Sequence, residues 1–200
     1  MRSSVVIVSF FALGVLLGYL GVIPLSLIDN DMSFYALCCL MFFVGVSLGN
    51  DSNTLKRFAS LNPRLYLLPV ATVVGTLLGC AIVSLLLPGR SVFDTMAIGS
   101  GFGYYSLSSI FITEYKGAEL GTIALLSNII REIITLLLAP FFVKFFGKLA
   151  PISVGGATTM DTTLPIILRF SGKEFAVVSV FHGFVLDLSV PVLVTIFCSL

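Results

Sequence analysis

Seven long apolar stretches constrain this chain more than any other feature of its sequence. They lie near residues 5–27, 33–48, 65–88, 93–113, 119–145, 151–169 and 174–200. Helices of about 20 residues match a hydrocarbon core about 30 Å thick, and the stretches are too long and continuous for barrel strands. We therefore predict a polytopic, all-α helical membrane protein of about seven spans, with residues 1–200 forming a single transmembrane domain.

The amino-acid composition agrees with a membrane protein and excludes several other classes. Hydrophobic residues make up 58% and charged residues 10% of the 200 residues, whereas soluble domains carry about 25% charged residues. The net charge of +1 comes without a run of basic residues, so nothing indicates nucleic-acid binding. The four cysteines lie in apolar stretches without metal-ligand spacing, which is typical of buried free thiols.

The distribution of basic residues predicts the orientation of the chain. With seven spans and a cytoplasmic N-terminus, the inside positions hold seven basic residues and the outside positions hold three. The inside set is Arg2, Lys56, Arg57, Arg64, Lys116, Arg169 and Lys173, and the outside set is Arg90, Lys144 and Lys148. The positive-inside rule then predicts a cytoplasmic N-terminus and a C-terminus on the opposite side.

Two of the apolar stretches are interrupted by small and polar residues. Stretch six (151–169) contains Gly155, Gly156, Thr158, Thr159, Asp161, Thr162, Thr163 and Pro165. Stretch four (93–113) contains Gly99, Gly101 and Gly103, followed by Tyr104, Tyr105 and Ser106. Paired interrupted segments indicate the binding site of a secondary transporter, because half-helix ends and free backbone groups can face a substrate or ion. The alternative is close packing of small residues between ordinary helices.

Five charged or titratable side chains (Asp, Glu, His, Arg) lie away from the ends of the apolar stretches. They are Arg131 and Glu132 in stretch five, Asp161 in stretch six, and His182 and Asp187 in stretch seven. A charged residue at the centre of a membrane helix costs about 2.5–3.5 kcal/mol, so each one is a candidate functional residue. Adjacent residues of a helix point about 100° apart, so Arg131 and Glu132 can face different neighbours.

Two interpretations of these charges stay open. In the first, Arg131 merely neutralises Glu132 or an acid on another helix, and His182 is a packed, hydrogen-bonded residue. In the second, Glu132 and Asp161 line a shared cavity and exchange a proton for a cation, as a proton-coupled antiporter requires. Further polar groups would come from Asn128, Thr158, Thr159, Thr162 and Thr163, with Asp187 as a secondary candidate.

Several motifs of enzymes are missing from the sequence. It has no phosphate-binding loop, no paired metal-binding histidines and no Gly-x-Gly-Asp arrangement of an intramembrane aspartyl protease. We therefore expect neither an enzyme nor a bound cofactor or metal.

Three motifs together resemble those of a known transporter family. The stretches Gly155–Pro165, 101–108 and Asn128–Glu132 are similar to lysine exporters of the LysO type, in the same order, across about residues 37–200. The resemblance implies inverted repeats with crossed, broken helices, distantly like cation/proton antiporters and bile-acid symporters. It also implies export of L-lysine and lysine analogues across the bacterial inner membrane, with Glu132 and Asp161 as the essential acids. Protons are the expected coupling ion, with Na⁺ as the alternative.

An odd number of spans is unusual for a fold of two equivalent halves. With a five-span repeat, stretch one would pair with stretch six and stretch two with stretch seven, leaving stretches three to five without counterparts. A small membrane subunit of about three spans, or a second copy in a homodimer, would then complete the transporter. Two other functions stay open: a monovalent cation/proton antiporter of the same architecture, and a non-transporting membrane subunit.

Overall fold

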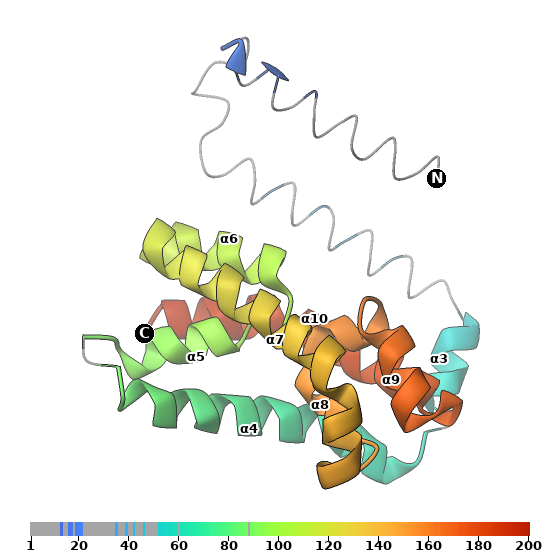
Figure 1. Cartoon of the computed structure of the whole chain (residues 1–200). Helices are drawn as coiled ribbons and strands as arrows, with labels where there is room; N and C mark the ends of the chain where they lie inside the picture. Colours follow the sequence, from blue (N-terminus) through green and yellow to red (C-terminus); the bar gives the residue numbers. More distant parts are fainter. Residues whose placement is uncertain are drawn as a thin grey trace. The chain divides into compact units, whose positions relative to one another are not determined.

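The computed structural model describes residues 52–59, 61–87 and 89–200, with isolated positions (13, 16, 17, 19–21, 35, 39, 42 and 46) before them. All regular structure in the continuous ranges is helical, as the sequence predicts. The chain divides into two compact units, Met1–Ser47 and Leu48–Leu200. Stretches one and two lie almost entirely outside the described residues, so the fold below is that of the second unit (Figure 1).

The described helices follow one another with short connections. They are α3 (Ser52–Ala59), α4 (Leu67–Ser84), α5 (Val92–Gly99), α6 (Tyr105–Lys116), α7 (Ala118–Phe146), α8 (Ala150–Gly155), α9 (Leu164–Ser171) and α10 (Ala176–Cys198). Three short 3-10 helices, η2 (Pro63–Tyr66), η3 (Gly156–Met160) and η4 (Lys173–Phe175), lie between them.

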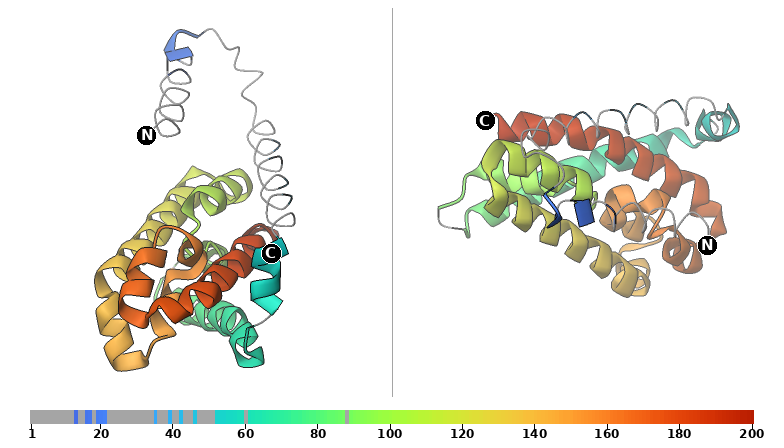
Figure 2. Two further views of the ribbon diagram at one scale, coloured as in Figure 1. Left: turned by 90° about the vertical axis from the view of Figure 1, so that its right-hand side faces the viewer. Right: turned by 90° about the horizontal axis from the view of Figure 1, so that it is seen from above.

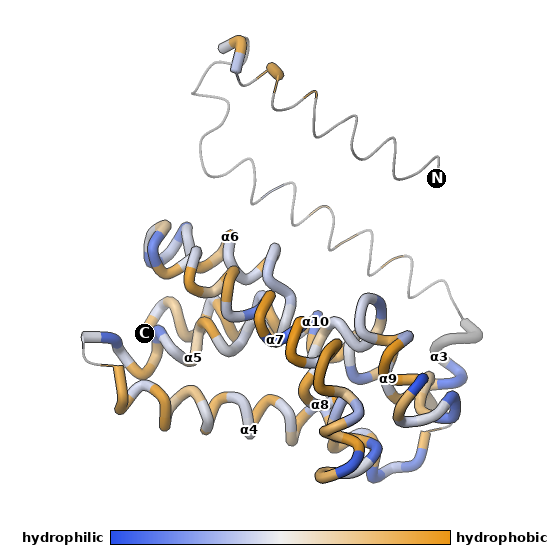
Figure 3. Tube along the Cα trace, in the orientation of Figure 1, coloured by the Kyte–Doolittle hydropathy of each residue, from blue (hydrophilic) through white to orange (hydrophobic). Residues whose placement is uncertain are grey.

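Three helices have the length of membrane spans. In the described part of the chain, Pro63–Ser84 and Lys173–Cys198 are long and apolar enough to cross a membrane by length and composition. Helix α7 has 29 residues, about 44 Å at 1.5 Å per residue, and carries Arg131 and Glu132 near its middle. Figure 3 shows apolar residues along the helices and hydrophilic residues gathered at their ends and connections. This pattern is that of a helical membrane protein.

Stretch four forms a helical hairpin of α5 and α6. The end of α6 lies at the same end of the second unit as the start of α5. Lys116 Nζ at the end of α6 lies 3.4 Å from Asp94 Oδ1 in the first turn of α5. Arg90, just before α5, pairs with Glu119 at the start of α7. The chain therefore turns back at 100–104 instead of continuing as the predicted span. We call this end of the second unit the Arg90 end.

Stretch six forms a second hairpin that starts from the opposite end. Lys148, just before α8, donates a hydrogen bond of 3.2 Å to Glu174, just after α9. Ile152 of α8 and Ile167 of α9 share a buried cluster with Val178 at the start of α10. We call this end the Lys148 end.

The two hairpins belong to an internal inverted repeat. Helix α4 starts beside the Ile152 cluster, where Leu65 and Leu68 pack, and runs to the Arg90 end before the hairpin α5–α6. Helix α7 runs the opposite way and precedes the hairpin α8–α9 (Figure 1). The repeat unit is therefore one long helix and one hairpin. In this arrangement stretches three and four correspond to stretches five and six. The five-span pairing involves stretches one and two, which lie outside the described residues.

Helix α10 packs against the place where the hairpins meet. A Cβ at Gly183 would lie 2.7 Å from Met160 N and 2.8 Å from Ala157 O, so α10 rests directly on the backbone of η3. Figure 2 shows α10 running lengthwise beside both hairpins. The hairpin tips and the middle of α10 thus form the buried centre of the second unit.

The basic residues of the described helices are divided unequally between the two ends. Figure 1 places α3, the start of α4, the end of α7 and the hairpin α8–α9 at the Lys148 end. The basic residues of these segments and of the short links next to them are Lys56, Arg57, Arg64, Lys144, Lys148, Arg169 and Lys173, whereas the Arg90 end has Arg90 and Lys116. Because each hairpin returns to its starting end, Lys144 and Lys148 change sides relative to the seven-span prediction. Lys116 moves the other way for the same reason.

Candidate functional site

The tips of the two hairpins meet backbone to backbone. The Ala157 N–H donates a hydrogen bond of 2.8 Å to the Phe102 carbonyl. A Cβ at Gly156 (φ +66°) would overlap this carbonyl, and one at Gly103 (φ +94°) would lie 3.2 Å from the Gly155 carbonyl oxygen. Glycine adopts positive φ without steric cost, and its missing side chain permits the close approach. The predicted interruptions of stretches four and six are therefore confirmed.

Phe102 is a residue of the site that the sequence analysis missed. It has φ +45°, although non-glycine residues rarely adopt positive φ, and it is fully buried. Its carbonyl is held by Ala157, and its ring faces the Arg131 guanidinium, with 5.8 Å from Cζ to the ring centroid. Its place between Gly101 and Gly103 is the sequence signal that could have indicated its role.

Asn128 of α7 holds the first hairpin tip in place. Its Oδ1 accepts from the Gly103 N–H at 2.7 Å, and its Nδ2 donates to Ala124 O at 2.8 Å and to Ile98 O at 3.3 Å. The side chain is buried, and its Oδ1 satisfies the Gly103 N–H at the point where the helix is broken. In the structure the Asn128 amide thus bonds backbone groups of the protein, whereas the sequence analysis predicts that it contacts the substrate.

We expect Asn128→Ala to lower the free energy of unfolding by about 2–4 kcal/mol. The change leaves the buried Gly103 N–H without its acceptor and opens a small cavity, and both effects are destabilising. Thermal unfolding of the purified protein in detergent measures the loss. Thr122→Ala on the same helix removes an exposed hydroxyl that bonds only Ala118 O, with an expected effect within about 0.5 kcal/mol. Equal losses for the two variants would contradict the role of Asn128.

Arg131 joins α7 to the second hairpin. Its Nε donates to Val154 O at 2.8 Å and its Nη2 to Ser153 O at 3.0 Å. These carbonyls belong to the last turn of α8, where free carbonyl groups and the helix dipole attract a cation. Among the described residues Arg131 takes part in no ion pair, so it is not neutralised by Glu132 in the way the first interpretation supposed.

His182 is packed and hydrogen-bonded inside the unit. Its Nε2 lies 3.0 Å from Thr72 Oγ1 on α4, and its Nδ1 lies 3.4 Å from Thr159 Oγ1 on η3. The side chain is fully buried, and both ring nitrogens have a partner. His182 thus connects α10 to α4 and to the second tip. Thr72 is a partner that the sequence analysis did not identify.

The threonines of the second tip mainly form hydrogen bonds with backbone carbonyls of the same tip. The hydroxyl groups of Thr158 and Thr159 each donate to the carbonyl oxygen three residues earlier at 2.8 Å. The Thr163 hydroxyl lies 3.2 Å from that of Thr158. These three side chains are buried, whereas Thr162 is exposed. The buried hydroxyls therefore replace helical hydrogen bonds that the interruption removes.

Two carboxylates, Asp161 and Asp187, are within electrostatic range of each other near the second hairpin tip. Asp161, which ends η3, is exposed, and its Oδ1 accepts from the Thr162 N–H at 2.5 Å. Asp187 of α10 is only 3% exposed, and its buried Oδ1 has no hydrogen-bond partner among the described residues. The two acids interact electrostatically with each other and with Tyr104 at the first tip. The structure therefore pairs Asp161 with a residue that the sequence analysis ranked as secondary.

Glu132 lies at the edge of the α7 face that touches the tips. It is half-buried, one turn after Asn128 and one turn before Thr135. Thr135 is buried, and its methyl group would lie 3.3 Å from a Cβ at Gly155. Arg131 lies about 100° around the helix from Glu132, so an acid and a cation flank this face on opposite sides.

The start of α6 places its polar residues differently from the prediction. Tyr105 and Ser106 are exposed, whereas Ser108 is buried and its hydroxyl donates to Tyr104 O at 2.8 Å. The first residue of α6 determines which of these side chains faces inward, and the sequence motif alone does not show where α6 begins. Ser108 was therefore missed.

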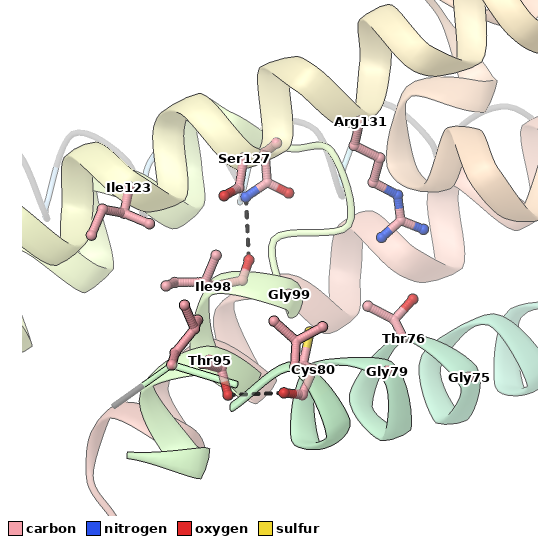
Figure 4. Close-up of a pocket in the computed structure, with 13 residues that line it drawn as sticks. Gly75, Thr76, Gly79, Cys80, Thr95, Ile98, Gly99, Ile123, Ser127 and Arg131 are labelled. Atoms are coloured by element: carbon pink, nitrogen blue, oxygen red, sulfur yellow. Dashed lines mark hydrogen bonds between the residues drawn. The ribbon is translucent and has the colours of Figure 1, made fainter. Parts of the chain in front are cut away.

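Two cavities meet at Arg131. One, of about 350 Å³, lies between α4, α5 and α7 and reaches Leu87 toward the Arg90 end (Figure 4). The other, of about 410 Å³, lies between α4, α7 and α8 and reaches Ala71 toward the Lys148 end. Gly75, Thr76 and Arg131 line both cavities, and Arg131 is the one charged residue in either lining.

Comparisons with known proteins agree with the motifs. The family model described as "Lysine exporter LysO" matches residues 8–198. "Lysine exporter LysO" of Escherichia coli (strain K12) is 36% identical over 170 residues, which are 85% of this chain and 56% of that protein. "Putative lysine exporter" of Haemophilus influenzae is 34% identical over 193 residues, which are 96% of this chain and 97% of that protein. No solved structure matches the chain.

The chain thus spans just over half of the Escherichia coli relative and nearly all of the Haemophilus influenzae relative. The family model covers almost the whole chain and includes both hairpins. The protein belongs to the lysine exporter LysO family.

Proposed function

We propose that this protein exports L-lysine and lysine analogues across the bacterial inner membrane in exchange for protons. The observation that carries the proposal is the meeting of two hairpin tips that enter from opposite ends. Asp161 ends the second tip, and Asp187 lies one turn after Gly183, which packs against that tip. Broken helices at the middle of a membrane protein are typical of the sites of secondary transporters. The substrate comes from the names of the two relatives.

The mechanism follows from competition between two kinds of positive charge. A cytoplasmic lysine would bring its ammonium group to Asp161, Asp187 or Glu132 and displace a proton. At 4 Å and an effective dielectric constant of 20, a pair of opposite charges gains about 4 kcal/mol. Protons from the outside would then reload the acids and release the lysine. Rocking of one repeat unit against the other would expose the site to each side in turn.

We propose that the Lys148 end faces the cytoplasm. It carries seven basic residues, compared with two at the Arg90 end, as the positive-inside rule favours. Helix α10 then places the C-terminus in the periplasm. Two crossings by stretches one and two would place the N-terminus in the cytoplasm, as the sequence analysis predicts.

We also propose that further membrane helices complete the transporter, as a small subunit of about three spans or as a second copy. Val70, Val74, Leu78 and Ile82 lie along one face of α4 and are exposed in this structure. The Escherichia coli relative is also longer than this chain. Native mass spectrometry of the protein released from nanodiscs would distinguish a monomer, a homodimer and a complex with a smaller polypeptide.

Transport by the purified protein in liposomes tests the main proposal. Liposomes are loaded with radiolabelled lysine and a pH-sensitive dye, and the external pH is lowered. We expect lysine efflux to accelerate and the lumen to acidify faster than in liposomes without protein, because each lysine that leaves admits protons. Acidification that needs internal Na⁺ instead of lysine would favour the monovalent cation/proton antiporter. No movement of either cation would favour the non-transporting subunit.

A further inference from the structure

Arg131 carries a positive charge that no described carboxylate balances. The ion pairs of the described residues involve Arg90, Lys116 and Lys148. The guanidinium contacts two backbone carbonyls of α8 and the ring of Phe102, which are neutral groups. Backbone carbonyls can partner a cation inside a membrane, but they do not cancel its net charge. Arg131 can therefore still attract an anion.

The surroundings of Arg131 leave room for such an anion. Figure 4 shows its side chain pointing from α7 toward Thr76 on α4, into the cavity that reaches the Arg90 end. The cavity that reaches the Lys148 end has Arg131 in its lining as well. Among the described residues its hydrogen bonds use Nε and Nη2 and not Nη1. A guanidinium has five N–H donors, so it can bind a carboxylate and keep both carbonyls.

Two acids lie within electrostatic range of the same hairpin tip. Phe102 contacts Arg131 through its ring, and Tyr104, two residues further along, interacts electrostatically with Asp161 and Asp187. The first tip thus contacts a cation through Phe102 and is within electrostatic range of two acids through Tyr104. A lysine molecule has the matching polarity, because its carboxylate and its side-chain ammonium lie at opposite ends.

We propose that Arg131 binds the α-carboxylate of the transported amino acid where the two cavities meet, while the acids hold the side-chain ammonium. The inference rests on the lysine export proposed above and defines its substrate class. Cationic molecules with a free α-carboxylate are substrates, and diamines of the same length are poor ones. Arg131 then serves as a binding residue in addition to holding the end of α8.

Competition in liposomes tests this subsite. Exchange of radiolabelled lysine by the purified protein is measured against unlabelled lysine, against lysine methyl ester and against cadaverine, which is lysine without its carboxylate. We expect lysine to compete at least about tenfold better than either analogue, as for the loss of one charge-assisted contact. Arg131→Gln should weaken competition by lysine about ten- to hundredfold and leave competition by cadaverine unchanged, so the preference disappears. Arg131→Lys should keep part of the preference.

The controls separate this subsite from a purely structural role of Arg131. Lys144→Gln removes a positive charge from the same helix outside both cavities and should preserve the ratio of lysine to cadaverine affinity. Equal competition by lysine and cadaverine in the unmodified protein overturns the subsite and leaves lysine export standing. If Arg131→Gln leaves the ratio of lysine to cadaverine affinity unchanged, the subsite proposal is also overturned and lysine export still stands. Absence of any lysine transport overturns both proposals. Should Arg131→Gln fail to fold, the unmodified protein and Arg131→Lys still decide the question.

Discussion

The Asp161→Asn substitution is expected to lower lysine efflux at least about a hundredfold while the protein stays folded. The carboxamide oxygen can still accept the hydrogen bond from the Thr162 N–H, but the group can neither carry a negative charge nor release a proton. A charge contact of about 4 kcal/mol exceeds the cost of a hundredfold loss, because each tenfold step corresponds to about 1.4 kcal/mol. The initial rate of radiolabelled lysine efflux from liposomes measures the effect at equal protein content.

Three companion variants identify the acids that act with Asp161. Asp187→Asn should show a similar loss, because this buried carboxylate is within electrostatic range of Asp161. Glu132→Gln tests the second of the two acids that the family resemblance implies to be essential, the first being Asp161. Glu114→Gln removes an exposed carboxylate from α6 and should keep the rate within about twofold. Unimpaired efflux by Asp161→Asn would refute its role in transport, and an equal loss in Glu114→Gln would show that the effect is not specific.

The Gly156→Ala substitution is expected to cause the largest loss of stability, about 2–5 kcal/mol. Its φ of +66° costs an alanine about 1–2 kcal/mol, and the new Cβ would overlap the Phe102 carbonyl, which adds about 1–3 kcal/mol. The tips must then separate, and the hydrogen bond between Ala157 and Phe102 is lost. For a chain of this size the loss lowers Tm by roughly 5–15 °C. Thermal unfolding in detergent measures it, and the liposome assay should show no efflux.

Gly147 provides the matched control for this substitution. It has a φ of +89°, and a Cβ there meets nothing within 4 Å. Gly147→Ala therefore carries the conformational cost of about 1–2 kcal/mol without the overlap. A Tm for Gly156→Ala no lower than that of Gly147→Ala would show that the contact between the hairpin tips contributes little to stability.

The interruptions of stretches four and six could be predicted because their causes are local. Gly101 and Gly103 in one stretch, and Gly155 and Gly156 in the other, lower helix propensity wherever the chain folds. Apolar stretches likewise predict membrane helices without any knowledge of neighbours. The structure confirms both, since the chain is helical and broken at these glycines.

The direction of the chain after each interruption could not be predicted in this way. Helices α5 and α6 have 8 and 12 residues, so together they match the length of one span. The hydropathy of the sequence is the same whether the second helix of the pair continues across the membrane or turns back. Contacts between distant residues reveal the return, such as Lys116 with Asp94 and Lys148 with Glu174. The same returns put Lys144 and Lys148 at one end.

The sequence by itself determined that this chain is a helical membrane protein with charged residues and two interrupted segments inside it. These properties depend on the cost of placing each side chain or backbone group in lipid, which is set residue by residue. Only the tertiary structure decided that the segments are hairpins, that Asp161 is within electrostatic range of Asp187, and that Asn128 holds a tip. Those outcomes depend on which residues come within hydrogen-bonding or electrostatic range of one another. Packing between helices that are distant in the sequence determines these contacts.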